Sequence, residues 1–269
     1  SETISSHPEY KAFEAQAAKH YQAWQSQVDN DLKALQIGIK PKLEIAQLAE
    51  GLLNHYTGQP LIDPYDIYQL IMDYWEEVLS DDFYQIAAEG WKVEPYRVIE
   101  IIKQGKKKGQ EKDVGWVCDL LPKQLLVAHA FANEQAALDA KQAELETVEA
   151  ALAEMVEEQS GEGGVFVDFD KVNKQEVNAR IKEIKGNTEF KDELSVLNDW
   201  YNQTKAITTL KKQVKEQDQA LDKSVLAHYP KLTEGEVKEI VVHDKWLAKL
   251  EVMITESNQA VLQSLTRRL

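Results

Sequence analysis

The sequence predicts a mainly α-helical fold: a helical bundle with a long antiparallel helix hairpin and a small β-hairpin. Only 7 of the 269 residues are proline and 12 are glycine, whereas the strong helix formers Ala, Leu, Glu, Lys and Gln are abundant. Apolar residues recur at steps of three and four along most of the chain, which is the period of one helix face. Residues 91–118 differ, because they are rich in β-branched and aromatic types that favour strands.

Two helices are predicted before residue 57. The first covers residues 8–36, and its apolar face consists of Phe13, Ala17, Tyr21, Trp24, Val28, Leu32 and Leu35. Gly38 and Pro41 then interrupt the pattern, since both residue types disfavour a helix interior. The second helix covers residues 42–56, and its apolar positions are Leu43, Ile45, Leu48, Leu52 and Leu53.

The stretch "IDPYDIYQLIMDYWEEVLSDD", residues 62–82, predicts a helix with an acidic face. Asp63 can cap its start, Pro64 suits the first helical position, and Asp66 lies near the positive end of the helix dipole. At about 100° per residue, four acids fall opposite the apolar stripe: Asp66, Asp73, Glu77 and Asp81. We expect a solvated face. The alternative is an enzyme that binds a divalent metal on the last three acids, but one helix alone rarely completes such a site.

A β-hairpin with a basic tip is predicted within residues 91–118. "WKVEPYRVIEII" and "VGWVCDLL" form its strands, and "KQGKKKGQEKD" lies between them. Pro95 favours an edge position for the first strand. Lys106, Lys107 and Lys108 form a compact cationic run flanked by glycines. This run is a candidate contact for a DNA phosphate backbone, and the alternative is a solvated loop tip.

Two long helices are predicted in the second half of the chain. The first runs from Leu125 to Glu158 and ends before a glycine-rich turn; Leu138, Leu145, Val148, Leu152 and Met155 recur in it near a seven-residue spacing. A short helix follows over residues 174–185. The second long helix covers residues 192–226, with Leu194, Leu197, Trp200, Ile207, Leu210, Val214 and Leu221 as apolar positions. Such a pair, joined by a compact insert, predicts an antiparallel hairpin.

The C-terminal part begins with a strong helix-start signal. Thr233 and Glu236 are spaced as a capping box, and Leu232 precedes them as a hydrophobic staple. A final helix is expected over residues 244–269. We therefore expect two regions: residues 1–122, a helical region with the small β-hairpin, and residues 123–269, with the long-helix hairpin and the C-terminal helices.

Charge and cysteine content limit the function classes. The formal net charge of −15 repels nucleic acid at long range, so free nucleic acid is not expected as the sole partner. Cys118 is the single cysteine, which excludes an internal disulfide and favours a reducing, cytoplasmic location. We expect it to be a buried, inert thiol. No apolar run approaches the ~20 residues that span a bilayer, so no membrane partner is expected.

Familiar catalytic signatures are absent from the sequence. It contains no dinucleotide-binding or Walker glycine loop, no Cys-x-x-Cys, no His-Glu-x-x-His and no Gly-x-Ser-x-Gly motif. The six histidines are scattered, and we expect each to be a hydrogen-bonding residue. The sequence also lacks an initial methionine and stops inside a helical pattern, so we expect it to be a piece of a longer protein.

Five stretches together carry a specific family resemblance. They are "PLIDPYDIYQLIMDYWEEVLSDDFYQIAAEGW", "DLLPKQLLVAHAFANEQAALDA", "VNARIKEIKGN", "HYPKLTEGEVKEIVVHDKW" and "QSLTRRL". Each resembles a block of the M (modification) subunit of type I restriction–modification systems, and they follow the family's order along nearly the whole chain. The chain departs from the family at His129, Ala130 and Phe131, where an Arg-Tyr-Phe-like triplet is expected, so any contact of that arginine is not carried over.

The resemblance implies that the chain follows the catalytic domain of an adenine-N6 DNA methyltransferase that uses S-adenosylmethionine. In that family two M subunits assemble with one specificity subunit, and restriction subunits join the complex on DNA. The family's cofactor loop, of the type Asp/Glu-Pro-x-x-Gly-x-Gly, has no match here, nor has its catalytic Asn-Pro-Pro-Phe/Tyr motif. We therefore predict no catalytic, cofactor-binding or metal-ligating residue in this chain and assign S-adenosylmethionine to the parent subunit.

Partner docking is the role that we expect for the chain. Long amphipathic helices bury little apolar area alone and tend to pack on partner helices, and the resemblance implies that these belong to the specificity subunit. The docking face is expected on one of the long helices or on the terminal helix. Candidate positions are Leu145, Val148, Leu152, Leu210 and Val214. The alternative is a free-standing helical adaptor or scaffold unrelated to methylation, which the upstream gene sequence would distinguish.

Overall fold

The computed structural model describes residues 8–266 and, among these, the side chains of residues 8–263. The described residues form a mainly α-helical fold with one two-stranded antiparallel sheet, which confirms the predicted fold class. The chain divides into two compact units: unit 1 comprises Ser1–His129 and Leu226–Leu269, and unit 2 comprises Ala130–Val225. The predicted boundary at residues 122/123 differs from this division, because the C-terminal helices belong with the N-terminal ones.

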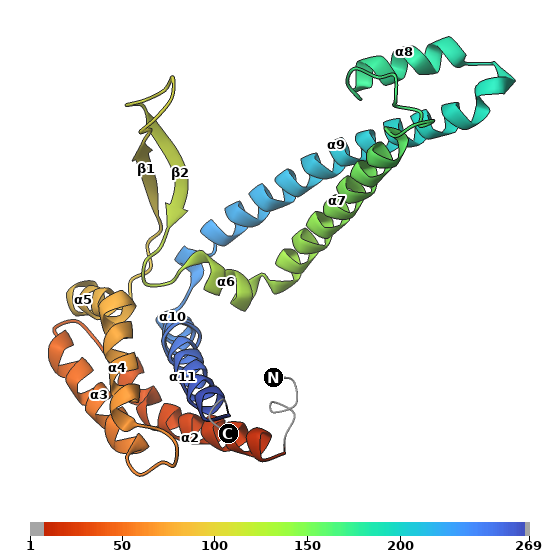
Figure 1. The fold of residues 1–269 in the computed structure, drawn as a ribbon. Coiled ribbons are helices and arrows are strands. Elements are labelled where there is room, and N and C mark those ends of the chain that lie inside the picture. The colour runs from red at the N-terminus through yellow and green to blue at the C-terminus, as the bar shows by residue number, and fades with distance from the viewer. Residues whose placement is uncertain (1–7, 267–269) are drawn as a thin grey trace. The chain divides into compact units, whose positions relative to one another are not determined.

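Unit 1 is built mainly from helices, of which α2 and α3 begin and end close to their predicted positions. Its elements in chain order are α2 (Pro8–Lys33), α3 (Pro41–Tyr56), α4 (Pro64–Tyr74), η1 (Trp75–Leu79), α5 (Ser80–Glu89), β1 (Tyr96–Ile101), β2 (Glu111–Val117), α6 (Lys123–Ala130), η3 (Tyr229–Lys231), α10 (Glu234–Glu239), η4 (Ile240–Leu247) and α11 (Ala248–Thr266) (Figure 1). The predicted start signals are confirmed: the Asp63 carboxylate accepts a bond from the Tyr65 amide, and Thr233 and Glu236 form a capping box.

The predicted helix with the acidic face contains a π-helical segment, and a second π-helical segment joins the helix that starts after Thr233 to the final helix predicted over residues 244–269. Residues 267–269 of that prediction lie outside the described residues. A third predicted helix is broken. α4, η1 and α5 run on without interruption, as do α10, η4 and α11, with η1 and η4 as the π segments. Such segments are rare, and periodicity does not reveal them. The helix predicted from Leu125 to Glu158 is interrupted at Phe131, which has a φ of −131°, so that α6 ends before α7 begins.

Aromatic donors join the N-terminal and C-terminal parts of unit 1. The Tyr21 hydroxyl donates to the Leu247 carbonyl at 2.7 Å, and the Tyr74 hydroxyl donates to the Lys245 carbonyl at 2.9 Å. Around these bonds lies an apolar core whose buried members include Trp24, Tyr56, Ile67, Ile71, Phe83, Ile86, Trp246 and Leu247. The C-terminal helix therefore completes a core that the N-terminal helices begin.

One ion pair lies within this core. Asp82 of α5 is only 3% exposed, and its carboxylate accepts bonds from the Lys245 ammonium at 2.7 Å and from the Trp246 indole N–H at 2.7 Å. Lys245 also donates to the carbonyls of Asp119 and Leu120, at 2.7 and 3.1 Å. Burial raises the pKa of Asp82, although the Lys245 charge opposes the shift. The pair links α5, η4 and the chain after β2.

The β-hairpin was predicted correctly in place and type. β1 and β2 pair antiparallel from Tyr96↔Val117 to Ile101↔Glu111, with a bulge between Val98 and Ile99. Gly115 lies opposite Val98 with a φ of +115°, a conformation that side chains disfavour. At the base, the Tyr96 hydroxyl donates to the Asp119 carboxylate at 2.9 Å. The hairpin extends away from the helices of unit 1 (Figure 1).

Unit 2 is the predicted antiparallel helix hairpin. Its elements are α7 (Ala132–Gln159), α8 (Lys174–Ile184), η2 (Thr188–Phe190) and α9 (Lys191–Leu226). Glu149 of α7 pairs with Lys211 of α9 at 2.7 Å, while Leu152 and Met155 pack against the cluster that contains Trp200, so the two helices run in opposite directions. α8 and the loop before it cover the far end of this pair (Figure 1).

A tight turn ends α7 where the sequence predicted it. A Cβ atom at Gly164 would lie 2.2 Å from the Gln159 carbonyl oxygen, so only glycine fits there without a backbone shift. After this turn, Phe166, Val177, Ile184, Leu197 and Trp200 form the buried cluster of unit 2.

We predict that Lys245→Met lowers the free energy of unfolding by about 3–5 kcal/mol, because it leaves the Asp82 carboxylate buried without a counter-charge. Chemical denaturation followed by circular dichroism measures this loss. Lys92→Met is the matched control, since the Lys92–Glu94 pair is exposed and such pairs contribute little. Equal stability of the Lys245 variant and wild type would contradict a structural role for the buried pair.

A stacked histidine pair joins α2 and α3. The rings of His20 and His55 lie 3.9 Å apart between centroids, and the Nε2 atom of each lies within hydrogen-bonding distance of the other's backbone carbonyl, at 3.0 and 2.8 Å. Burial lowers the pKa of His20, and the nearby His55 lowers it further. The folded chain therefore favours a neutral His20 ring.

From this shift we predict acid sensitivity. A histidine whose pKa is depressed in the folded state contributes stability above its ordinary pKa of about 6.5, and this stability is lost as the pH falls through the folded value. Urea unfolding at pH 7.5, 6.5 and 5.5 should show a stability loss that is smaller in His20→Gln, which retains a side-chain donor. Parallel pH profiles for variant and wild type would count against this origin.

Candidate interaction surfaces

The predicted basic run lies at the tip of the β-hairpin. Lys106, Lys107 and Lys108 occupy a turn in which the Lys108 amide donates to the Gly105 carbonyl at 3.2 Å. Below it, the Gly109 amide donates to the Ile102 carbonyl at 2.8 Å, and the Ile102 amide donates to the Gln110 carbonyl at 2.9 Å. All three lysines are exposed. The structure thus brings the predicted cations together on one ordered turn.

The predicted docking positions lie on the paired helices of unit 2. Leu210 is buried, at 6% exposure, whereas Leu145, Val148, Leu152 and Val214 are half-buried. Leu152 packs against the cluster of unit 2, and the Glu149–Lys211 pair places the neighbouring Val148 and Leu210 close to the contact between α7 and α9. Leu152 and Leu210 therefore already contribute to the packing of unit 2, and the half-buried side chains also leave apolar surface uncovered.

The acidic face of residues 62–82 is solvated, as predicted. Asp66, Asp73, Glu77 and Asp81 are all exposed. Within the described residues, no three His, Cys, Asp or Glu side chains are grouped so that they could hold a metal ion. Asp82 is the buried exception. It lies eleven residues after Ile71, about three helical turns, so its place on the apolar stripe was a signal available in the sequence.

A cleft of about 560 Å³ lies beside the buried ion pair. It is lined by residues of η1, α5, η4 and the segment after β2, including Glu77, Asp81, Cys118, Asp119 and Lys245. Cys118 is buried, and this burial raises the pKa of its thiol. The thiol is therefore held protonated, which makes it a poor nucleophile. Lys245 already donates to Asp82 and two carbonyls.

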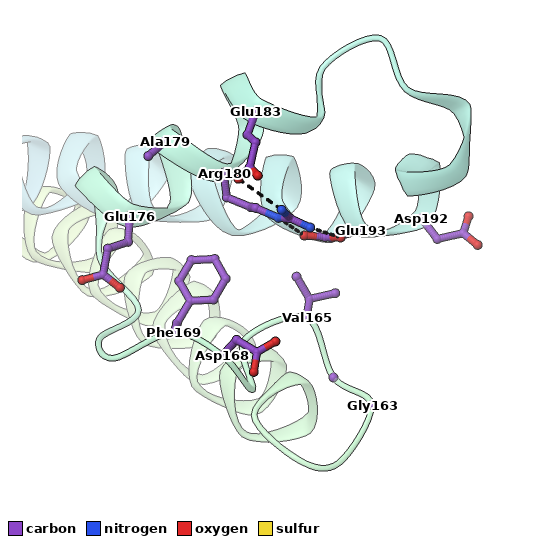
Figure 2. A pocket seen from close by; sticks show the side chains of 11 residues that line it. Gly163, Val165, Asp168, Phe169, Glu176, Ala179, Arg180, Glu183, Asp192 and Glu193 are labelled. Carbon is purple, nitrogen blue, oxygen red and sulfur yellow. Dashed lines mark hydrogen bonds and ion pairs between the residues drawn. The ribbon is translucent and has the colours of Figure 1, made fainter.

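A second cavity, of about 690 Å³, lies at the far end of unit 2 (Figure 2). Arg180 of α8 spans it: its guanidinium donates to both carboxylate oxygens of Glu193, at 2.6 and 3.1 Å, and lies 3.1 Å from Glu183. Phe169 and Val165 form an apolar wall. Periodicity did not single out Arg180, because its partner Glu193 is separated from it by a turn and lies on another helix.

The role of Arg180 in this cavity is structural. Its guanidinium nitrogens are bonded to the carboxylates of Glu193 and Glu183. The guanidinium carbon lies 5.2 Å from the Phe190 ring centroid. Bidentate arginine–carboxylate pairs fix geometry as well as contributing energy. Here the pair joins α8 to the start of α9. It thereby holds the segment between α7 and α9 against these two helices.

Comparison with known proteins found no matching family model, no matching curated protein and no matching solved structure. None of the helices in the described part of the chain is both long and apolar enough to cross a membrane.

We predict that Arg180→Lys loosens the insert without unfolding the long helices. Lysine keeps the charge but loses the bidentate geometry of the guanidinium, and for this partly buried pair the cost is about 1 kcal/mol. Hydrogen exchange should accelerate in α8 while the exchange of residues 205–215 in α9 stays unchanged. Unaltered exchange in α8 would show that the Arg180–Glu193 pair does not hold it.

Proposed function

We propose that this chain is the assembly region of the modification subunit of a type I restriction–modification system, and that it docks the specificity subunit. Methyl transfer to adenine N6, and the S-adenosylmethionine that supplies the methyl group, belong in this proposal to another part of the parent polypeptide. The restriction subunit and DNA complete the complex, which works in the cytoplasm.

The apolar surface of unit 2 is the observation that carries the proposal. α7 has 28 residues but buries only Leu138. Leu145, Val148 and Leu152 of α7 and Val214 of α9 remain half-buried although the two helices pair. Two helices cannot enclose an apolar stripe from all sides, and bundles do so with three or four. A helix from a partner would cover the remaining surface in the manner of helix-in-groove recognition.

The positions of the family-like blocks give further support. Asp82 lies in "PLIDPYDIYQLIMDYWEEVLSDDFYQIAAEGW", Lys245 and Trp246 in "HYPKLTEGEVKEIVVHDKW", and the carbonyls of Asp119 and Leu120 in "DLLPKQLLVAHAFANEQAALDA". Three blocks that are far apart in the sequence thus meet at one buried network. The resemblance therefore rests on residues that hold unit 1 together.

Retention of the chain by the specificity subunit of the same system tests the proposal. We predict that a double variant, Leu145→Lys with Val214→Lys, weakens binding at least tenfold, which corresponds to about 1.4 kcal/mol, because charges at the half-buried positions would have to be desolvated on docking. Calorimetric titration of the purified proteins measures this change.

The control is Ala151→Lys, which adds a charge at an exposed position of α7 and should bind like wild type. Both proteins must first show the circular dichroism and thermal unfolding of wild type. Leu210→Asp is unsuitable as a test, because Leu210 is buried within unit 2. If the folded double variant bound the specificity subunit with wild-type affinity, α7 and α9 would not be the docking surface.

The parent reading frame separates this proposal from the alternative of a free-standing helical adaptor. An S-adenosylmethionine loop and an Asn-Pro-Pro-Phe/Tyr motif upstream of Ser1 would support the methyltransferase subunit. A frame without either motif would favour the adaptor, for which the same half-buried stripe could bind an unrelated partner helix.

A further inference from the structure

The β1–β2 hairpin concentrates positive charge in an acidic chain. Residues 96–117 contain six basic and three acidic side chains, a net charge of +3, whereas the whole chain carries −15. Within the loop, residues 102–110, there are four lysines and no acid: Lys103, Lys106, Lys107 and Lys108. The charge of the tip is therefore opposite in sign to that of the protein.

The tip lysines are not neutralised by neighbouring acids. Among the described residues, no ion pair joins Lys103, Lys106, Lys107, Lys108 or Lys112 to a carboxylate, although other lysines of this chain form such pairs, for example Lys33, Lys92, Lys141 and Lys238. On the hairpin, Arg97 lies 3.6 Å from Asp113. The cations at the tip are left available for an external anion.

The length of the hairpin reduces the repulsion from the rest of the chain. β1 contributes six paired residues, which at about 3.3 Å each place the tip roughly 20 Å from the hairpin base. At about 0.1 M salt, charges are largely screened beyond ~10 Å. An anion at the tip is therefore exposed chiefly to the lysines and only weakly to the acidic surface.

We propose that this tip binds the phosphate backbone of double-stranded nucleic acid, independently of sequence. Lysine ammonium groups on an ordered turn suit phosphate oxygens, which protein contacts to a duplex use for positioning. Single strands are bound through aromatic stacking platforms, and residues 102–110 contain no aromatic side chain. Residues 103–110 also lack apolar side chains that could insert into a lipid surface.

Fluorescence anisotropy of the 269-residue chain with a labelled 20-base-pair duplex tests the site. Changing Lys106, Lys107 and Lys108 together to Glu should weaken binding at least tenfold at 50 mM salt. For wild type, three phosphate contacts predict a slope of about −2.7 for log K against log salt, hence binding about 40-fold weaker at 200 mM than at 50 mM. Parallel titrations with a DNA duplex and an RNA duplex show which of the two phosphate backbones the tip binds.

The control changes Lys205, Lys212 and Lys215 of α9 to Glu, which alters the net charge of the chain by the same amount and leaves the Glu149–Lys211 pair intact. It should weaken binding less than threefold. Equal losses in both triple variants would overturn the proposal, because they would reflect overall charge. So would the absence of wild-type binding at 50 mM salt, a preference for single strands, or retention on phosphatidylserine vesicles without duplex binding. No partner protein is needed, so failure here leaves the docking proposal untouched.

Discussion

The buried pair of Asp82 and Lys245 is the constraint on which the arrangement of unit 1 depends. Removing two charges from water costs several kcal/mol per ion, and only close geometry with satisfied hydrogen bonds offsets this cost. Here each partner has more than one bond: the carboxylate accepts from Lys245 and Trp246, and the ammonium also donates to the carbonyls of Asp119 and Leu120. Burial raises the pKa of Asp82, and the Lys245 charge and the bonds from Lys245 and Trp246 oppose this shift.

This hydrogen-bond network fixes the base of the β1–β2 hairpin. Because Lys245 holds the carbonyls of Asp119 and Leu120, the chain leaves β2 at a defined point. The carboxylate of Asp119 accepts from the Tyr96 hydroxyl at the start of β1, and the Trp116 and Tyr229 rings meet edge to face, with centroids 5.5 Å apart. A two-stranded ribbon alone is only marginally stable. Its base is secured by polar and aromatic contacts, so that its outer part remains free to present the lysines.

Periodicity predicted most of the helices, because an apolar stripe reports the face that a helix buries. The limits of α2, α3, α8 and α9 lie within a few residues of the expected ones, and the caps at Asp63 and Thr233 are where side-chain chemistry requires them. Sequence reasoning missed the features that depend on contacts between distant segments. The ion pair of Asp82 was not predicted, because its partner Lys245 lies 163 residues away, and the return of α11 to the N-terminal core has no local signal.

The charge of α7 limits which partner helix could cover the half-buried apolar side chains of unit 2, namely Leu145, Val148, Leu152 and Val214. This helix contains eight acidic residues and one lysine, whereas the basic and acidic residues of α9 are equal in number. Only Glu149 of the α7 acids is paired with α9, through Lys211. In the proposed complex, a docking helix would present an apolar seam flanked by basic side chains, since a like-charged rim would oppose association. The same acids repel a nucleic acid duplex, so the proposed phosphate contact is confined to the hairpin tip.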